Sequence, residues 1–285
     1  MFSAKLALKT NSEHQTTIKI SEGVSVGGKD LLIIAGPCAV ESLEQMEQVA
    51  RHLAAAPVQM LRGGVYKPRT SPYAFQGLGD AGLKILDAVR QRYNIPVVTE
   101  VMAIAQIESI VAHADMLQIG SRNMQNFDLL KAVGKTNKPV MLKRGLAATI
   151  EEFIFAAEYI LSHGNPNVIL CERGIRSFDN YTRNVLDLGA VVALKQLTHL
   201  PIVVDPSHAA GKRELVAALA RAAVAAGADG LMIECHPQPE KSVSDARQAL
   251  ALQEMVELVH SLRSVAAAVG RHVPIVEPQR QLAVA

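Results

Sequence analysis

One pattern repeats along most of this chain. A short, β-branched apolar run is followed by roughly 10 to 15 residues with the spacing of an amphipathic helix. The runs are apolar throughout rather than alternating, which is typical of parallel strands covered on both faces. Several follow a helix-ending residue, as after Pro57, Pro96 and Gly227. Eight such runs occur, at residues 31–35, 58–62, 97–100, 116–119, 140–143, 168–171, 202–205 and 231–234.

The eight runs alternate with helical patterns, so the units join in series. Eight strand-helix units in 285 residues fit a (β/α)8 TIM barrel of roughly 250 residues better than an open sheet. Around Glu22 and Gly23 the sequence predicts a short β-hairpin capping the bottom of the barrel. We expect an N-terminal extension at 1–30, a barrel at 31–270 and a tail at 271–285. The predicted helices are 43–55, 81–92, 103–113, 127–135, 150–162, 185–197, 213–226 and 245–269.

Composition and charge exclude several classes of partner. The balance of 29 Lys and Arg against 27 Asp and Glu leaves a net charge of +2, too small for broad binding to nucleic-acid phosphates. The sequence shows no signal-peptide pattern and no apolar span near 20 residues, so we expect no membrane partner. Three cysteines at 38, 171 and 235 are too few for a disulfide framework. We therefore expect a cytoplasmic protein.

A barrel of this type builds its active site at the C-terminal ends of its strands. Every predicted strand end carries a polar or reactive residue. In chain order these are Cys38, Arg62 with Lys67 and Arg69, Glu100, Arg122, Lys143, Arg173, His208 and Glu234.

One group of these residues has the character of metal ligands. Cys38, His208, Glu234 and Asp245 form a mixed soft and hard set that suits a borderline divalent ion. No two have the close spacing of a structural zinc site. Cys38 could equally be a small buried apolar residue, and we assign Cys171 and Cys235 to packing.

Basic residues form the second group. The fold brings scattered cations to one rim, which favours a multiply anionic substrate such as a phosphate ester. Thr70 and Ser71 beside Arg69 suit a phosphate, although a proline-led turn explains them as well. The glycine-rich patterns of dinucleotide and nucleoside triphosphate sites are absent. The rim cations are Arg62, Lys67, Arg69, Arg122, Lys143, Arg144, Arg173, Arg176 and Lys212.

These residues lie in motifs that resemble a known family. Between residues 35 and 237 the chain reads, in order, GPCAVES, RGGVYKPRTSPYAFQGLG, TEVM, IGSRNMQN, LKRG, CERGIR, DPSHAAGKRE and IECHP, with SDARQAL following. Together they closely resemble 3-deoxy-D-arabino-heptulosonate 7-phosphate (DAHP) synthases of the short microbial type Iβ. The resemblance implies a transferase that opens the shikimate pathway to chorismate and the aromatic amino acids. Such enzymes condense phosphoenolpyruvate with D-erythrose 4-phosphate and release phosphate.

The resemblance also implies roles for residues. Cys38, His208, Glu234 and Asp245 become the ligands of one divalent metal ion, such as Mn, Fe, Co or Zn, whose identity the donor set leaves open. Lys67 lies between the substrates as a proton donor, and Cys38 and His208 also count as catalytic. Erythrose 4-phosphate lies on Arg69, Thr70 and Ser71. Phosphoenolpyruvate is held by Arg62, Lys67, Arg122, Lys143 and Arg173, with Glu100 close by.

One position departs from the family pattern. Ala246 follows Asp245 where the family usually has glycine, and alanine tolerates positive φ poorly. If the loop requires that conformation at residue 246, Asp245 is the weakest of the four ligands.

Alternative functions remain open at this point. The sister enzyme that makes 3-deoxy-D-manno-octulosonate 8-phosphate from arabinose 5-phosphate typically has Lys-Ala-Asn-Arg where this chain has Lys67-Pro68-Arg69. An inactive barrel acting as a binding or regulatory partner is the alternative of another class. A fused chorismate mutase or ferredoxin-like domain has no room, so we expect no feedback inhibition by aromatic amino acids. A homodimer or homotetramer is the expected assembly.

Overall fold

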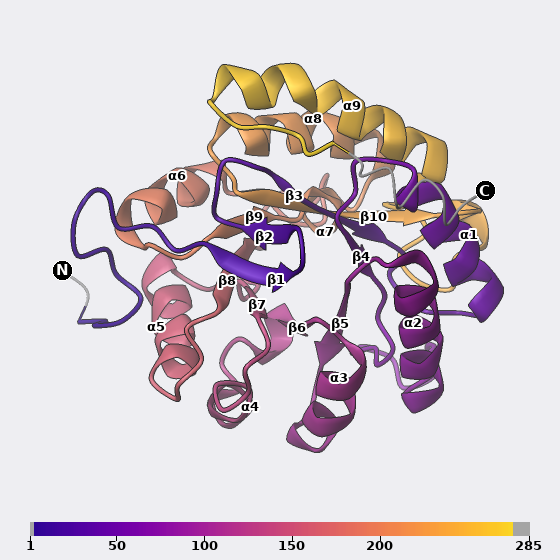
Figure 1. The fold of residues 1–285 in the computed structure, drawn as a ribbon, viewed down its shortest axis with the longest axis horizontal. Helices are drawn as coiled ribbons and strands as arrows, with labels where there is room; N and C mark the ends of the chain where they lie inside the picture. Colours follow the sequence, from indigo (N-terminus) through magenta and orange to yellow (C-terminus); the bar gives the residue numbers. More distant parts are fainter. Residues whose placement is uncertain (1–2, 276–285) are drawn as a thin grey trace.

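The computed structural model describes residues 3–275 as a closed parallel barrel with helices around it (Figure 1). Each barrel strand pairs in parallel with the next along the chain, and β10 pairs with both β9 and β3, which closes the barrel. The (β/α)8 fold is thereby confirmed. The strands are β3 (Leu32–Gly36), β4 (Met60–Arg62), β5 (Val97–Val101), β6 (Met116–Ile119), β7 (Val140–Lys143), β8 (Val168–Glu172), β9 (Ile202–Val204) and β10 (Gly230–His236).

The helices begin where side chains satisfy their first free N–H groups. Ser42 accepts a hydrogen bond from the N–H of Gln45, and Thr149 forms a reciprocal capping box with Glu152. The outer helices are α1 (Leu43–Ala54), α2 (Asp80–Tyr93), α3 (Ile107–His113), α4 (Phe127–Val133), α5 (Ile150–Leu161), α6 (Leu188–Leu197), α8 (Arg213–Ala225) and α9 (Leu252–Ala268).

Side chains alternate between the two faces along each strand, and this divides the core into two parts. In β3, Ile33 and Ala35 pack outward against the helices, whereas Leu32 and Ile34 pack inside the barrel. The predicted hairpin is also present, as β1 (Ile18–Ser21) and β2 (Val24–Val26). In Figure 1 it lies over the middle of the barrel, and its buried Ile18 and Val26 join the interior cluster. The hairpin therefore fills the N-terminal end of the barrel and leaves the opposite end for the site.

Three predicted elements need correction. The helix expected from Asp245 begins only at Leu252, because Leu250 and Ala251 form the short strand β11 (Leu250–Ala251) beside β10. The segment expected as one helix at 103–113 is a 3₁₀ turn (Ile104–Gln106) followed by α3. The helix expected from residue 185 begins after its N-cap Asp187.

A five-residue helix that the sequence pattern did not predict, α7 (Pro206–Ala210), follows β9 directly. Along the described part of the chain, no helix is both long and apolar enough to cross a membrane. Residues 276–285 of the predicted tail lie outside the described residues.

Candidate metal and phosphate site

A cavity of about 350 Å³ opens at the C-terminal ends of the strands, which we call the strand-end cavity. The site residues predicted from the sequence are expected to meet at this end of the barrel. Its lining residues are Arg62, Lys67, Pro68, Arg69, Thr70, Glu100, Gln118, Gly120, Ser121, Arg122, Lys143, Leu146, Arg173, Arg176, Arg183, Asn184, His208 and Asp245.

Most of the predicted rim cations line this cavity, but two do not. Arg144 is buried and lies 2.8 Å from the carboxylate of Glu172 and 3.0 Å from that of Asp187. Lys212 stacks its ammonium over the ring of Tyr181, 3.3 Å from the centroid. The prediction that these two join the other cations of the rim is wrong, because neither lines the cavity and each contacts a partner elsewhere. Arg183, which the sequence reading omitted, lines the cavity instead.

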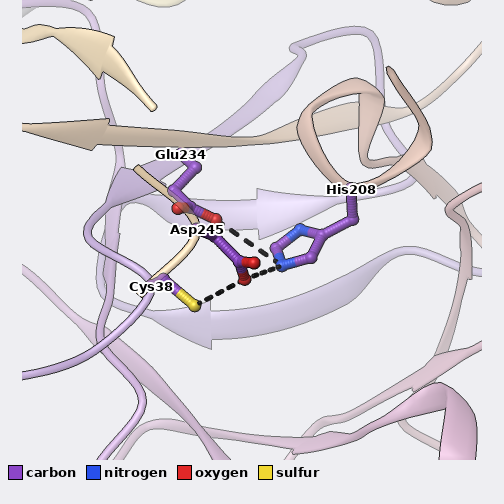
Figure 2. A group of neighbouring side chains, drawn as sticks. All are labelled: Cys38, His208, Glu234 and Asp245. Carbon is purple, nitrogen blue, oxygen red and sulfur yellow. Dashed lines mark hydrogen bonds and ion pairs between the residues drawn. The ribbon is translucent and has the colours of Figure 1, made fainter. Parts of the chain in front are cut away.

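The four predicted metal ligands converge. One donor atom from each of Cys38, His208, Glu234 and Asp245 lies within 4.8 Å of the others (Figure 2). The Cys38 thiol donates to Asp245 Oδ2 at 3.2 Å. His208 Nε2 lies 3.5 Å from Glu234 Oε2 and 3.8 Å from Asp245 Oδ2. The four ligands come from different elements: Cys38 from the loop after β3, His208 from α7, Glu234 from β10 and Asp245 from the loop that follows β10.

The donor set fits a divalent ion. Among the described residues, the buried Oε1 of Glu234 has no hydrogen-bond partner, an arrangement that costs free energy unless something binds there. Thiolate, imidazole and carboxylate ligands together suit a borderline transition metal.

The backbone at Asp245 resolves the question of the missing glycine. Asp245 itself has φ +57°, and the only other described non-glycine residue with positive φ is Asn94. Aspartate and asparagine adopt this conformation more readily than most residues. Ala246 therefore carries no left-handed strain, and the departure from the family pattern leaves Asp245 at the site.

Asp205, which the sequence reading did not select, orients His208. It is fully buried and caps α7 by accepting a hydrogen bond from the His208 N–H at 2.9 Å. Its Oδ2 lies 2.7 Å from His208 Nδ1 and also pairs with the Lys143 ammonium. His208 thus presents Nε2 to the other ligands, the usual arrangement of a carboxylate behind a metal-binding histidine. The signal available in the sequence was an aspartate at a strand end, three residues before the histidine.

Burial and neighbouring charges set the protonation of this group. Burial lowers the pKa of His208 to about 3, and the nearby cations Lys143 and Arg62 act in the same direction. Its imidazole is therefore neutral near pH 7, the form that binds metals. Burial raises the pKa of Glu234 to about 7 and raises that of the Cys38 thiol.

The pKa values of Asp205 and Asp245 are lowered, in contrast to the raised pKa of Glu234. Burial opposes their ionisation, but the facing positive groups outweigh it and lower both carboxyl pKa values. His208, which is protonated only at acidic pH, is the largest favourable contribution for each in the acidic range where these carboxyl groups titrate. Both aspartates are therefore anionic at neutral pH.

The cationic side of the cavity holds unsatisfied donors. Within residues 3–275, buried guanidinium nitrogens of Arg62, Arg69 and Arg173 have no hydrogen-bond partner. Arg62 and Arg173 are each only 5% exposed. Buried charges persist at low cost only when they are paired, so these side chains are arranged for an anion that enters the cavity.

Lys67 connects the cationic side to the metal ligands. Its ammonium donates to the Cys38 carbonyl at 2.7 Å and approaches the Cys38 Sγ at 3.0 Å. Glu100 lines the same cavity, and burial raises its pKa, although Lys67 and Lys143 oppose that shift. A Cβ on Gly120 would lie 2.0 Å from Glu100 Oε1, so a glycine leaves room for this carboxyl group.

Thr70 and Ser71 differ in their placement. Thr70 lines the cavity beside Arg69, whose Nε donates to the Phe75 carbonyl at 3.0 Å. Ser71 is exposed and is not among the lining residues, and its hydroxyl accepts from the Tyr73 N–H at 3.3 Å.

Comparison with known proteins identifies the family. The DAHP synthetase I family model matches residues 14–270. A phospho-2-dehydro-3-deoxyheptonate aldolase of Thermotoga maritima is 48% identical over 266 residues, 93% of this chain and 78% of that protein. A 2-dehydro-3-deoxyphosphooctonate aldolase of Syntrophotalea carbinolica is 33% identical over 271 residues, 89% of this chain and 97% of that protein.

The crystal structure of a Thermotoga maritima DAHP synthase superimposes on this fold with a TM-score of 0.92 at 47% identity, covering 95% of this chain and 79% of that one. Sequence and structure agree, and the chain belongs to the DAHP synthetase I family.

Proposed function

We propose that this protein is a DAHP synthase, a transferase that condenses phosphoenolpyruvate, D-erythrose 4-phosphate and water into DAHP and inorganic phosphate. The observation that carries the proposal is the strand-end cavity, where buried arginine nitrogens without hydrogen-bond partners line the same space as a four-donor metal group. Family membership and the greater identity to the heptonate enzyme, 48% against 33% for the octonate enzyme, support it. The reaction is the first of the shikimate pathway.

The cations explain how two anionic substrates share one cavity. Arg62, Arg122, Lys143 and Arg173, with Lys67, would hold phosphoenolpyruvate, and Glu100 would lie beside it. Arg69 and Thr70 would hold the aldose phosphate, with Ser71 at the outer edge. Charge neutralisation allows the two reacting carbons to approach, which is a proximity effect. Lys67 would donate a proton at the reacting centre.

The metal ligands in this proposal are Cys38, His208, Glu234 and Asp245. A bound divalent ion would supply a Lewis acid for negative charge on the aldehyde oxygen. Mn, Fe, Co and Zn are all compatible with the donors.

The proposal also covers the cellular location, the assembly and the division of the chain. We propose that the enzyme works in the cytoplasm on small phosphorylated substrates, as a homodimer or homotetramer. Residues 1–30 would serve as an extension, residues 31–270 as the catalytic barrel and residues 271–285 as a tail.

The test is a phosphate-release assay with phosphoenolpyruvate and each of two aldose phosphates. The protein is first treated with a chelator, and single divalent metals are then added back. We expect turnover with erythrose 4-phosphate that is lost on chelation and restored by at least one transition metal.

Two outcomes would contradict the proposal. Activity with arabinose 5-phosphate alone would assign the octonate reaction instead. Absence of phosphate release with either aldose and every metal would favour an inactive barrel that acts as a binding partner.

A further inference from the structure

The two carboxylate ligands of the metal group are joined by a chain of hydrogen bonds outside that group. Arg183 Nη1 donates to Asp245 Oδ1 at 3.1 Å and to Gln248 Oε1 at 3.1 Å. Gln248 Nε2 donates in turn to Glu234 Oε2 at 3.0 Å. We call the side chains of Arg183 and Gln248 the carboxylate bridge.

The bridge holds one oxygen of each carboxylate. Arg183 occupies Asp245 Oδ1, so that Oδ2 faces Cys38 and His208. Gln248 donates to Glu234 Oε2, the oxygen that also lies 3.5 Å from His208 Nε2, whereas Oε1 is the buried oxygen without a hydrogen-bond partner in the described chain. Gln248 thus holds Glu234 directly, Arg183 holds Asp245, and the Gln248 amide oxygen links the two contacts.

The backbone holds the bridge in place. Gln248 is only 2% exposed, and its N–H donates to the Asp245 carbonyl at 3.1 Å across the turn. The Arg183 N–H donates to the Ala210 carbonyl at the end of α7, the helix that carries His208. A Cβ on Gly211 would lie 2.6 Å from the Arg183 Cβ, so glycine there lets the arginine approach. Three ligand-bearing segments, α7, β10 and the loop after it, therefore meet at the bridge.

We propose that Arg183 and Gln248 are positioning residues that act as one unit to hold Glu234 and Asp245 in the orientations in which they bind the metal. The inference rests on the proposed metal site and extends it to residues that do not bind the ion. Hydrogen-bonded groups behind metal ligands typically contribute 10- to 100-fold in metal affinity.

The experiment measures affinity for Co²⁺ by competition with a fluorescent chelator, together with the visible absorption spectrum of the Co²⁺ protein. Gln248→Leu keeps the side-chain size but removes both hydrogen bonds. We expect it to weaken Co²⁺ binding by about 10- to 100-fold and to change the ligand-field bands. Arg183→Met should act in the same direction and Arg183→Lys should retain most of the affinity, because an ammonium can still donate to Asp245. Arg247→Gln, at an exposed neighbour of Gln248, is the matched control and should leave both readouts unchanged.

The double variant Arg183→Met with Gln248→Leu decides whether the two residues form one unit. We expect it to be little worse than the weaker-binding single variant, since either change already breaks the bridge. The proposal would be overturned if the loss of Co²⁺ affinity in the double variant equalled the product of the two single losses. It would also be overturned if the single variants had unchanged affinity and spectrum. Arg183 is partly exposed, so its variants remain informative if Gln248→Leu fails to fold. If the unmodified protein binds no Co²⁺, the proposed metal site fails as well; if it binds normally and the variants match it, only the bridge is refuted.

Discussion

Asp205 couples two neighbouring parts of the site without belonging to the proposed ligand set. One of its carboxylate oxygens faces both the His208 imidazole and the Lys143 ammonium. Its charge therefore fixes which histidine nitrogen is free for a metal and also holds a cation against the cavity. A change at Asp205 should affect metal binding and phosphoenolpyruvate binding together.

Asp205→Asn preserves shape but removes this charge. We expect metal affinity to fall by about 10- to 100-fold and the KM for phosphoenolpyruvate to rise, because His208 and Lys143 lose their common partner. Metal titrations of steady-state rate and direct metal-binding measurements check this. The matched control is Glu172→Gln, an equally buried carboxylate paired with Arg144 away from the cavity, which should lower stability but not metal affinity. Equal metal affinity in Asp205→Asn and the unmodified protein would contradict the assignment.

The sequence alone predicts the position of some site residues but not of others. Cys38 and His208 each lie three residues after a predicted strand, so the periodicity that locates a strand also locates them. Arg144 also follows a strand, but the direction of its side chain toward Glu172 depends on packing that periodicity does not contain. Arg183 and Gln248 lie in irregular loops, and only the folded chain brings their side chains together.

Among the elements, the segment between β10 and α9 shows why a helical pattern can mislead. Its apolar spacing continues a helix back to Asp245, yet Asp245 adopts positive φ and Leu250 pairs with Cys235 of β10. Backbone pairing along a strand satisfies the N–H and C=O groups there, so tertiary context outweighs local propensity. The hairpin, by contrast, was predictable because its turn residues Glu22-Gly23 lie between two short strand patterns, and Gly23 has φ +71°.

The hairpin should stabilise the barrel without affecting catalysis. Ile18→Ala removes a side chain that is 1% exposed among the interior residues, and such truncations cost about 2 to 5 kcal/mol of unfolding free energy. Urea unfolding should show this loss, whereas kcat at low temperature should remain near that of the unmodified protein because the site lies at the other end. Lys19→Ala, the exposed neighbour on the same strand, should change stability by less than about 0.5 kcal/mol. Equal unfolding free energies for Ile18→Ala and Lys19→Ala would show that the hairpin does not contribute to the core.

At the scale of the whole molecule, closure of the barrel explains how a nearly neutral chain makes a strongly charged site. The net charge is only +2, but strand ends far apart in sequence meet around one cavity, and their cations meet with them. The carboxylates of the metal group and Asp205 lie beside these cations and balance much of their charge. Fold class and the location of the site were thus predictable from the order of elements, whereas the pairing of each charge depended on three-dimensional contacts.

The metal group also connects α7, β10 and two loops, so loss of the ion should lower the stability of the whole molecule. A ligand at 100 times its Kd stabilises the native state by about 2.7 kcal/mol if the unfolded chain does not bind it. For a domain near this size, that corresponds to roughly 5 to 10 °C in Tm. We expect a chelator to lower Tm by about this amount and Mn²⁺ to restore it, as followed by differential scanning calorimetry. Cys38→Ser should abolish most of the Mn²⁺-dependent shift, whereas Cys171→Ser, at a cysteine buried in the barrel interior, should retain it. A Tm that does not respond to the chelator or to Mn²⁺ would argue against a metal that links these segments.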